Sequence, residues 1–487
     1  MKQNKRGKAK DESIFLLPFA FRLLIMATQK KVAIIGLDSA VPELIFDQWA
    51  ADLPNLTLLR QQGIYGELES CDPPITVPAW MTMMTSKDPG QLGVYGFRNR
   101  KDYSYDGLYF ANSRSIREDT VWDILSRLGR KVILVGIPQT YPPKAINGQM
   151  ITCFLTPSTK SQYTYPPELR QEVEGLVGEY ILDADNFRTE DKEDLLRRIH
   201  EMTRRRFKVA KYLLKNKEWD FFMMVEMGVD RIHHGFWKYF DKGHRKYEPG
   251  NPFESAIKEY YQYIDQEIGE ILSLLDRDTV TLVVSDHGAK RMEGGICVNE
   301  WLIQEGYLKL RSYPNEVIPF SKAEVDWERT KVWSEGGYYA RVFMNVKGRE
   351  PQGVIDLKDY EKIRDELIAK LEAITDENGK NIGTRVFRPE QLYIQCNNVP
   401  PDLIVYFGNL DWRSVGSIGL KTIHTFENDT GPDDANHAKY GTFILRDPQK
   451  RIGKQVDGLQ IMDISPTILN LMGLEVPRDM RGKVISY

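Results

Sequence analysis

The feature that most constrains the fold of this chain is a series of short apolar runs that alternate with helix-like segments. The runs VAIIGL, KVILVGIP, FFMMVEM and TVTLVVS are apolar along most of their length, which is typical of strands buried on both faces of a sheet. Amphipathic segments lie between these runs in the sequence. If those segments formed helices on both faces of the sheet, they would bury the apolar strands. The alternation therefore predicts an α/β fold with a mostly parallel central sheet and helices on both faces.

The same patterns predict further elements. DLIVYF and GTFILR are expected to be strands as well. Apolar residues recur every three or four positions in 357–374, which indicates an amphipathic helix. The remaining expected helices are VPELIFDQWA, TVWDILSRLG and the segments 191–216 and 252–275.

Composition excludes several classes of protein. The formal net charge is -3 and no long basic stripe appears, so no nucleic-acid partner is expected. The four cysteines are far apart and show no CxxC spacing, which argues against a disulfide framework or a cysteine zinc site. A reducing compartment, and hence a cytoplasmic location, is the expectation. The 487 residues are enough for one elaborated α/β domain or for several modules.

The N-terminal segment superficially resembles an export signal. The basic stretch KQNKRGKAK precedes the apolar IFLLPFAFRLLIMA, but Pro18 and Arg22 interrupt the apolar run. It is too short to span a bilayer unaided, so no stable membrane span is expected. We expect 1–26 to be a weakly ordered extension and the fold to occupy 27–487. Two blocks, about 155–218 and 303–395, interrupt the core pattern as insertions that either shape access to a pocket or add scaffold.

Acidic and histidine side chains follow two of the predicted strands. Asp38 follows VAIIGL, and the pair Asp286-His287 follows TVTLVVS. Ligand sites of α/β sheets lie at the carboxyl ends of the strands. The sequence therefore predicts an oxygen- and nitrogen-rich pocket suited to divalent metals, although an isolated aspartate such as Asp38 is also a common helix cap or turn residue.

A second group lies in MMVEMGVDRIHHGFW. Asp230 and His234 are four residues apart and lie on one face of a helix, and His233, at three residues, is geometrically equivalent. Spacing alone leaves both histidines open. Thr76, in PPITVPAW, is either a capping hydroxyl or, with a metal that lowers its pKa, a nucleophile.

Taken in order, these residues carry a family resemblance. The succession Asp38, Thr76, Asp230-x-x-x-His234, Asp286-His287 and His437 resembles the alkaline phosphatase superfamily. Within it, the chain looks most like the type I phosphodiesterase/nucleotide pyrophosphatase group and its phosphohydrolase and phosphomutase-like relatives. The C-terminal LQIMDISPTILNLMGLEVPRDMRGK is similar to the ending found across the phosphatase and sulfatase branches. The resemblance covers most of 31–154, 219–301 and 400–487.

The resemblance implies a two-metal site in an alkaline-phosphatase-like catalytic domain. One divalent ion would be held by Asp230, His234 and His437, and the other by Asp38, Asp286 and His287. Thr76 would be the nucleophile and a shared ligand. The family pattern favours His234 over His233, and His437 over its neighbour His424. Zinc suits the mixed carboxylate and imidazole ligands, and manganese is the alternative.

Two positions depart from the family pattern. Ala79 stands where nucleotide pyrophosphatases commonly carry an asparagine that donates to the phosphate, and Leu92 stands where many relatives carry a histidine. Arg98 and Asn99 are the candidate replacements for phosphate binding, since arginine presents a planar fork. The alternative is that Arg98 is an ordinary structural arginine.

The expected function is metal-dependent hydrolysis of phosphoric diester or pyrophosphate bonds in a small phosphorylated substrate. The alternatives are a phosphomonoesterase or phosphomutase of the same superfamily, or a catalytically idle protein that binds a phosphorylated ligand. Sulfatase chemistry is disfavoured, because the stretch from Cys71 has Ile75 where the modification motif needs arginine. No oligomeric state or metal identity follows from the sequence.

Overall fold

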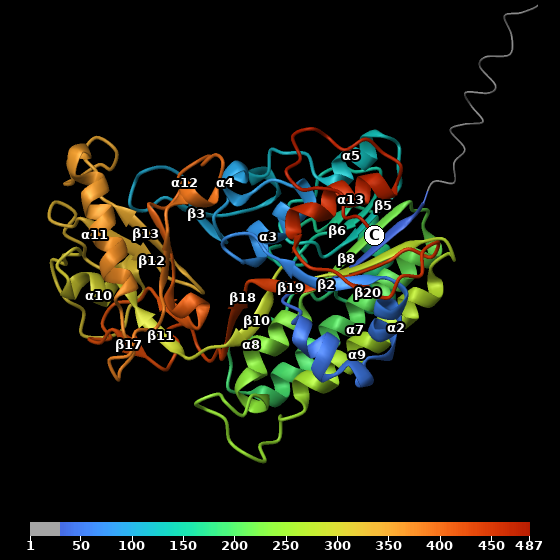
Figure 1. Ribbon diagram of the computed structural model, residues 1–487, viewed down its shortest axis with the longest axis horizontal. Helices are drawn as coiled ribbons and strands as arrows, with labels where there is room; N and C mark the ends of the chain where they lie inside the picture. Colours follow the sequence, from blue (N-terminus) through green and yellow to red (C-terminus); the bar gives the residue numbers. More distant parts are fainter. Residues whose placement is uncertain (1–29) are drawn as a thin grey trace, which may run out of the picture.

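A ten-stranded sheet forms the centre of the larger part of the molecule (Figure 1). The structure, a computed structural model, describes residues 30–487, so the predicted N-terminal extension lies outside the described residues. Strand order is β20-β2-β19-β9-β1-β8-β5-β6-β7, and β21 also pairs with β2. The strands are β1 (Val32–Leu37), β2 (Ile64–Glu69), β5 (Val132–Val135), β6 (Gly148–Ile151), β7 (Thr164–Tyr165), β8 (Phe221–Glu226), β9 (Val280–Val284), β19 (Tyr440–Arg446), β20 (Lys454–Gln455) and β21 (Leu459–Gln460).

The sheet is parallel at its centre, as predicted. β1 lies between β8 and β9 and pairs with both in parallel, and β8 and β6 pair with β5 in parallel. All six residues of β1 are buried, which explains why this strand reads as one continuous apolar run. β19, the predicted strand GTFILR, is antiparallel to β2 and β9.

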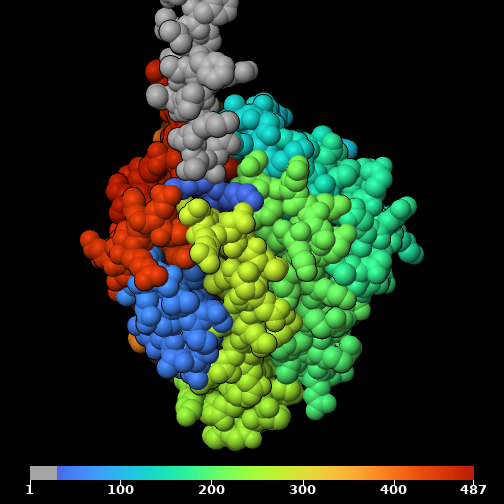
Figure 2. All heavy atoms as spheres, turned by 90° about the vertical axis from the view of Figure 1, so that its right-hand side faces the viewer, coloured from blue at the N-terminus to red at the C-terminus, as the bar shows by residue number. Residues whose placement is uncertain are grey.

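Helices cover both faces of this sheet (Figure 1). On one face lie α2 (Pro54–Gln62), α7 (Lys192–Asn216), α8 (Gly228–Phe240) and α9 (Ala256–Leu274), and on the other α3 (Thr76–Thr85), α5 (Val121–Arg127) and α13 (Ile464–Leu471). Figure 2 shows α2 in blue against α9 in yellow-green. The helices predicted at TVWDILSRLG, 191–216 and 252–275 are confirmed as α5, α7 and α9.

The predicted insertion at 155–218 contributes to this core. Its helix α7 packs against β5 and β8, and its side chains Ile199, Met202 and Phe207 are buried in the main hydrophobic core. α6 (Leu169–Val177) packs on α7 in turn. Most of the helical residues of this segment therefore pack against the central sheet or against each other and stabilise the fold.

A smaller unit with its own hydrophobic core contains most of the second predicted insertion. It holds one four-stranded sheet, in the order β12-β13-β15-β14, and one three-stranded sheet, in the order β16-β11-β17. Its elements are β11 (Gly294–Cys297), α10 (Val298–Gln304), β12 (Val332–Glu335), β13 (Ala340–Met344), α11 (Tyr360–Glu372), β14 (Arg385–Phe387), α12 (Pro389–Leu392), β15 (Leu403–Tyr406), β16 (Trp412–Val415) and β17 (His424–Thr425). The helix predicted over 357–374 is confirmed as α11.

The strand predicted at DLIVYF is confirmed as β15, which lies in the smaller unit. An apolar run shows that a strand is buried but not which sheet buries it. One predicted element differs in the structure. VPELIFDQWA is not a regular α-helix: a π-helical turn at Leu44–Gln48 is followed by a 3₁₀ turn at Ala50–Asp52. The irregular winding buries three consecutive side chains, Leu44, Ile45 and Phe46.

Short elements connect the two units near the carboxyl edge of the central sheet. These are α4 (Pro89–Leu92), β3 (Arg98–Arg100), β4 (Leu108–Phe110), β10 (Gly288–Arg291) and β18 (Ala435–Ala438), with β3 paired to β4 and β10 paired to β18. Within residues 30–487, no helix has both the length and the apolar character needed to cross a bilayer.

Candidate metal centre and its pocket

The sheet topology brings the predicted ligands to one edge. Asp38 follows β1 and Asp286-His287 follow β9, and these strands are parallel neighbours in which Gly36 pairs with Val284. Asp230 and His234 lie in α8, which begins just after β8, the other neighbour of β1. His437 comes from β18, where it is paired with Ala289 of β10. Neighbouring strand ends thus deliver all six side chains to the same place.

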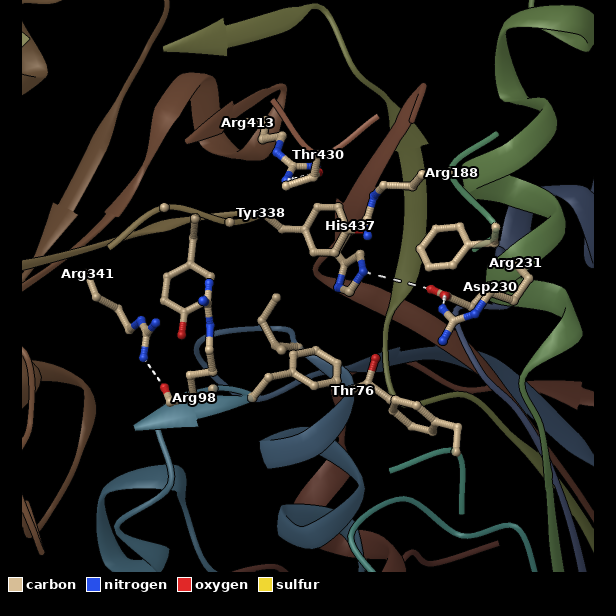
Figure 3. Close-up of a pocket in the computed structure, with 18 residues that line it drawn as sticks. Thr76, Arg98, Arg188, Asp230, Arg231, Tyr338, Arg341, Arg413, Thr430 and His437 are labelled. Atoms are coloured by element: carbon tan, nitrogen blue, oxygen red, sulfur yellow. Dashed lines mark hydrogen bonds and ion pairs between the residues drawn. The ribbon is translucent and has the colours of Figure 1, made fainter. Parts of the chain in front are cut away.

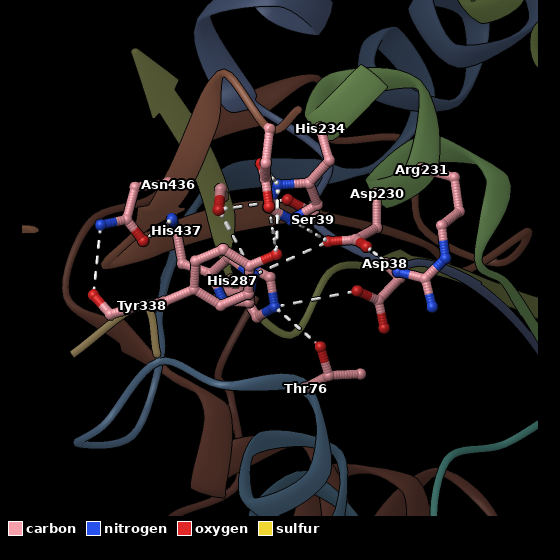
Figure 4. A network of polar contacts seen from close by, with 12 residues as sticks. Asp38, Ser39, Thr76, Asp230, Arg231, His234, His287, Tyr338, Asn436 and His437 are labelled. Carbon is pink, nitrogen blue, oxygen red and sulfur yellow. Dashed lines mark hydrogen bonds and ion pairs between the residues drawn. The ribbon is translucent and has the colours of Figure 1, made fainter. Parts of the chain in front are cut away.

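These side chains form two buried sets of three (Figure 4). In the first, His287 Nε2 lies 3.2 Å from Asp286 Oδ2 and 3.7 Å from Asp38 Oδ1. In the second, Asp230 Oδ1 lies 3.2 Å from His234 Nε2 and 3.8 Å from His437 Nε2. The two sets are contiguous, because the rings of His287 and His437 stack with centroids 3.9 Å apart.

In these carboxylates one oxygen faces the centre of its ligand set, and in Asp38 and Asp286 the other oxygen accepts a hydrogen bond that fixes the side chain. Asp38 Oδ1, Asp230 Oδ1 and Asp286 Oδ2 are buried without a hydrogen-bond partner among residues 30–487. The second oxygen of Asp38 accepts a hydrogen bond from Trp80 Nε1 at 2.7 Å, and that of Asp286 accepts one from the Ser39 backbone N–H at 3.2 Å. An unsatisfied buried carboxylate oxygen is costly unless a cation or donor meets it. The donor set therefore fits divalent metal ions.

The three histidines are oriented in the same manner. Nδ1 of His287 lies 3.0 Å from the Gly288 carbonyl oxygen, and Nδ1 of His437 lies 2.9 Å from the Pro74 carbonyl oxygen. Nδ1 of His234 lies 2.8 Å from Asp433 Oδ1. A hydrogen bond from Nδ1–H fixes the tautomer, which leaves Nε2 as the metal-binding atom. All three Nε2 atoms face the carboxylates of their own sets.

The burial of so many charges in one place shifts their pKa values. Desolvation, followed by the charge of Asp230, raises the pKa of Asp38, and desolvation and the charge of Asp38 raise the pKa of Asp286. Burial lowers the pKa of His287 to about 4, so this imidazole is neutral at pH 7. Burial opposes protonation of His234 too, but Asp433 and Asp230 outweigh it and raise its pKa to about 9. The centre thus has an excess of carboxylate charge that cations would neutralise.

Thr76 lies beside both sets at the first residue of α3. Its side chain is buried, and Oγ1 lies 3.3 Å from His287 Nε2. Because α3 begins at Thr76, the positive end of the helix dipole lies at this residue. Trp80, four residues after Thr76, donates a hydrogen bond to Asp38 and so helps to hold this candidate ligand in place. Trp80 directly follows Ala79, the residue that departs from the family pattern.

The structure places the two competing histidines elsewhere. His233 points away from the carboxylates: its Nε2 lies 3.1 Å from the Tyr261 hydroxyl and its ring packs on Trp237. His424 lies in β17 of the smaller unit, with its Nε2 2.7 Å from the Thr375 carbonyl oxygen. Among these alternatives, His234 and His437 are the residues at the centre.

Three residues that support the centre were not predicted from the sequence. Tyr338 stacks on His437 and His234, with ring centroids at 4.3 and 4.8 Å, and its hydroxyl donates to Asp433 Oδ2 at 3.0 Å. Arg188 Nε donates to the same Asp433 oxygen at 2.9 Å. Tyr338 and Arg188 lie in loops without any periodic pattern. Only the acidic pair in GPDDANH, just before His437, was a signal that pointed to Asp433.

A pocket of about 300 Å³ opens onto Thr76, Asp230 and His437 (Figure 3). Arg98, one of the two expected phosphate-binding residues, lines it. Asn99 does not: it is buried, its Oδ1 accepts from the Tyr95 N–H at 2.7 Å and its amide donates to the Gly96 carbonyl at 2.8 Å. Asn99 therefore stabilises a turn, which corrects the expectation that it faces the substrate. The other lining residues are Ile75, Gly96, Phe97, Phe154, Phe187, Arg188, Arg231, Gly336, Gly337, Tyr338, Tyr339, Arg341, Arg413 and Thr430.

The fold is a mostly parallel central sheet flanked by helices, and two contiguous sets of candidate metal ligands lie at the carboxyl edge of that sheet. The sequence pattern of the type I phosphodiesterase/nucleotide pyrophosphatase family matches residues 32–433, and the chain belongs to that family. It is by class a phosphoric ester hydrolase. The family is generally dependent on divalent metals and acts on small phosphorylated substrates.

Solved structures show the same fold at low sequence identity. Murine ectonucleotide pyrophosphatase/phosphodiesterase 5, as an inactive variant in complex with AMP, aligns with a TM-score of 0.54 and 11% identity, over 92% of this chain and 97% of that chain. The human protein of the same name gives 0.54 and 12% over the same shares. Phosphonoacetate hydrolase from Sinorhizobium meliloti, in complex with phosphonoformate, gives 0.57 and 15%, over 91% and 95%. No curated protein sequence matches the chain.

Proposed function

We propose that this protein hydrolyses phosphoric diester or pyrophosphate bonds with Thr76 as the nucleophile and two divalent cations as cofactors. The observation that carries the proposal is the set of three unpartnered carboxylate oxygens, on Asp38, Asp230 and Asp286, that face three histidine Nε2 atoms beside the Thr76 hydroxyl. Mixed carboxylate and imidazole ligands favour zinc, with manganese as the alternative.

The residues of the chain have distinct roles in this proposal. Asp230, His234 and His437 would hold one cation, and Asp38, Asp286 and His287 the other. Cations held there would lower the pKa of a nearby hydroxyl and neutralise charge on a phosphoryl group. Thr76 is positioned by the start of α3, and the helix dipole at that end favours an anion next to its hydroxyl.

The proposed reaction has two displacement steps at phosphorus. In the first, Thr76 Oγ1 forms a bond to phosphorus and the bond to the leaving oxygen breaks, while the Thr76 proton is lost to solvent and the leaving oxygen gains one. In the second, a water oxygen bonds to phosphorus and the Oγ1–phosphorus bond breaks, which restores the Thr76 hydroxyl. The products are the leaving alcohol or leaving phosphate compound and a phosphate monoester that carries the water oxygen.

The experiment compares Thr76→Ala with Thr82→Ala, a matched deletion of a buried hydroxyl in the same helix. Both variants and the unmodified protein are loaded with zinc or manganese and assayed on bis(p-nitrophenyl) phosphate, p-nitrophenyl phosphate and p-nitrophenyl sulfate. We expect Thr76→Ala to lose at least about a thousandfold in kcat on the diester while it retains its metal, and Thr82→Ala to keep its activity. Diester hydrolysis that survives Thr76→Ala would show that Thr76 is not the nucleophile, and a preference for the monoester would favour a phosphomonoesterase.

A further inference from the structure

The wall of the pocket carries five arginines, and three of them are neutralised by nearby carboxylates. Arg231 pairs with Asp183 at 2.8 Å and also contacts Asp230. Arg188 and Arg413 share Asp433, at 2.9 and 3.4 Å. Their charges are therefore part of the ionic network that holds His234 and Asp230.

The other two arginines, Arg341 and Arg98, are less fully neutralised, and the carboxylate nearest in the fold is that of Glu335, which is paired with Arg341 across β12 and β13. Only 6% of Arg341 is exposed, yet among residues 30–487 no carboxylate oxygen lies within 4 Å of its guanidinium, which donates instead to the Arg98 carbonyl oxygen. The Arg98 side chain is 48% exposed, and its one carboxylate neighbour, Glu335, is 4.0 Å away. Two positive charges therefore lie near each other in the pocket, and Glu335 is the one carboxylate that the described residues place near them.

These two arginines lie at the opposite end of the pocket from the metal ligands. Arg341 belongs to β13 of the smaller unit and Arg98 to β3, whereas Asp230 belongs to α8 of the larger unit. Figure 3 shows Arg98 and Arg341 on one side of the pocket and Asp230 and Arg231 on the other. Aromatic side chains, among them Phe97, Tyr338 and Tyr339, also line the pocket.

We propose that Arg98 and Arg341 form a subsite for a second anionic group, so that the substrate is a small phosphoric ester with a carboxylate or a further phosphoryl group remote from the scissile bond. A nearly buried guanidinium without a counter-ion is costly, and an anionic ligand would supply the missing partner. The planar fork of arginine matches the oxygens of a carboxylate or phosphoryl group. This inference rests on the proposed function in one respect: it assumes that the scissile phosphoryl group binds at Thr76.

The test measures ligand binding and not turnover. The zinc-loaded protein is titrated calorimetrically with alkane bisphosphonates and with ω-phosphonocarboxylates whose spacers run from one to four carbons, each against the alkylphosphonate of the same chain length. We expect the best dianion of the series to bind at least about tenfold more tightly than its matched monophosphonate. The bisphosphonate and phosphonocarboxylate arms show which second anion is preferred, and metal analysis after titration excludes simple chelation.

Three variants assign the preference to the subsite. Arg98→Gln removes a charge whose carboxylate neighbour, Glu335, is 4.0 Å away, and Arg341→Lys keeps the charge but loses the planar fork. We expect each to reduce the dianion advantage at least about threefold. Arg385→Gln, which removes an exposed arginine of the same unit outside the pocket lining, is expected to leave it unchanged.

Equal affinities for dianions and monoanions in the unmodified protein, or an advantage that persists in both pocket variants, would overturn the subsite. Should Arg341→Lys fail to fold, as judged by its melting temperature, Arg98→Gln decides alone. A protein that prefers dianions but does not hydrolyse bis(p-nitrophenyl) phosphate or the phosphomonoester would retain the subsite and refute the proposed function, so the two failures are distinguishable.

Discussion

His234 Nδ1 lies 2.8 Å from Asp433 Oδ1, although 199 positions separate the two residues in the chain. The contact fixes the imidazole so that its Nε2 lies 3.2 Å from Asp230 Oδ1, its partner in the second ligand set. Asp433 is itself buried and accepts hydrogen bonds from Arg188 and Tyr338. The orientation of a candidate metal ligand in the larger unit therefore depends on a loop that returns from the smaller one.

Replacing Asp433 by asparagine should weaken metal binding. Partners that orient a ligating histidine typically contribute 10- to 100-fold in metal affinity, so we expect a loss of roughly that size for one of the two ions. The measurement is competition with a zinc-binding chromophoric chelator. Asp434→Asn is the matched control, since Asp434 is also buried but its carboxylate does not contact a candidate ligand histidine. Equal losses in both variants would indicate a general structural effect.

Removal of His437 should cost one metal ion. His437→Ala deletes one of three ligands in its set and leaves Asp38, Asp286 and His287 in place. We expect the bound zinc to fall from about two ions per chain to about one, and the diesterase activity to fall by at least about a hundredfold. Inductively coupled plasma mass spectrometry gives the stoichiometry. His424→Ala, which removes a histidine bonded to a backbone carbonyl in the smaller unit, should leave both values unchanged; a metal loss there would reverse the assignment.

Gly36, near the carboxyl end of β1, should not tolerate a side chain. A Cβ at this position would lie 2.5 Å from the Trp80 ring and 3.0 Å from the Met224 carbonyl oxygen. Overpacking of this kind costs about 1–3 kcal/mol, and displacement of Trp80 would also disturb its hydrogen bond to Asp38. We expect Gly36→Ala to lower both the melting temperature and the metal affinity.

The matched control for that substitution is Gly175→Ala in α6. In the described part of the chain, nothing lies within 4 Å of a Cβ added there. Alanine is favoured over glycine inside a helix by about 1 kcal/mol, so this variant should be slightly more stable. A Gly36→Ala protein as stable as Gly175→Ala would show that the packing around β1 relaxes freely.

His244 should make stability depend on pH below neutrality. Burial lowers its folded-state pKa from 6.5 to about 4, and its Nδ1 accepts a hydrogen bond from the Lys246 N–H at 3.0 Å. Between pH 6.5 and 4 the unfolded chain binds the proton more readily, so the stability that the neutral imidazole contributes is complete above pH 6.5 and declines as the pH falls. The pKa difference corresponds to at most about 3 kcal/mol.

The check is the melting temperature of the unmodified protein and of His244→Gln between pH 7.5 and 4. We expect the unmodified protein to lose more stability than the variant over that range, because glutamine does not titrate. Parallel pH profiles for the two proteins would contradict this account and assign the acid sensitivity to other groups.

Much of the fold and of the candidate site was predictable from the sequence, for an identifiable reason. β1 and β9 are buried on both faces, so their apolar runs were visible, and the polar residues Asp38, Asp286 and His287 follow them directly. By contrast, VPELIFDQWA has a helical pattern but winds as a π turn and a 3₁₀ turn, since local periodicity does not record how tightly tertiary packing winds the backbone. DLIVYF was correctly predicted as a strand, but the sheet to which it belongs was not predictable, because strand pairing is decided over long sequence separations.

The sequence by itself determined the class of the protein, the succession of candidate ligands and the nucleophile candidate, because the family resemblance that implies them rests on residue types and their order along the chain. The tertiary structure decided between His234 and His233, turned Asn99 inward, and placed Asp433 behind His234. It also placed Arg341 at the far end of the pocket with no carboxylate oxygen of residues 30–487 within 4 Å of its guanidinium. These outcomes depend on which loops from the two units meet, and no local pattern encodes the direction in which a side chain points across such a junction.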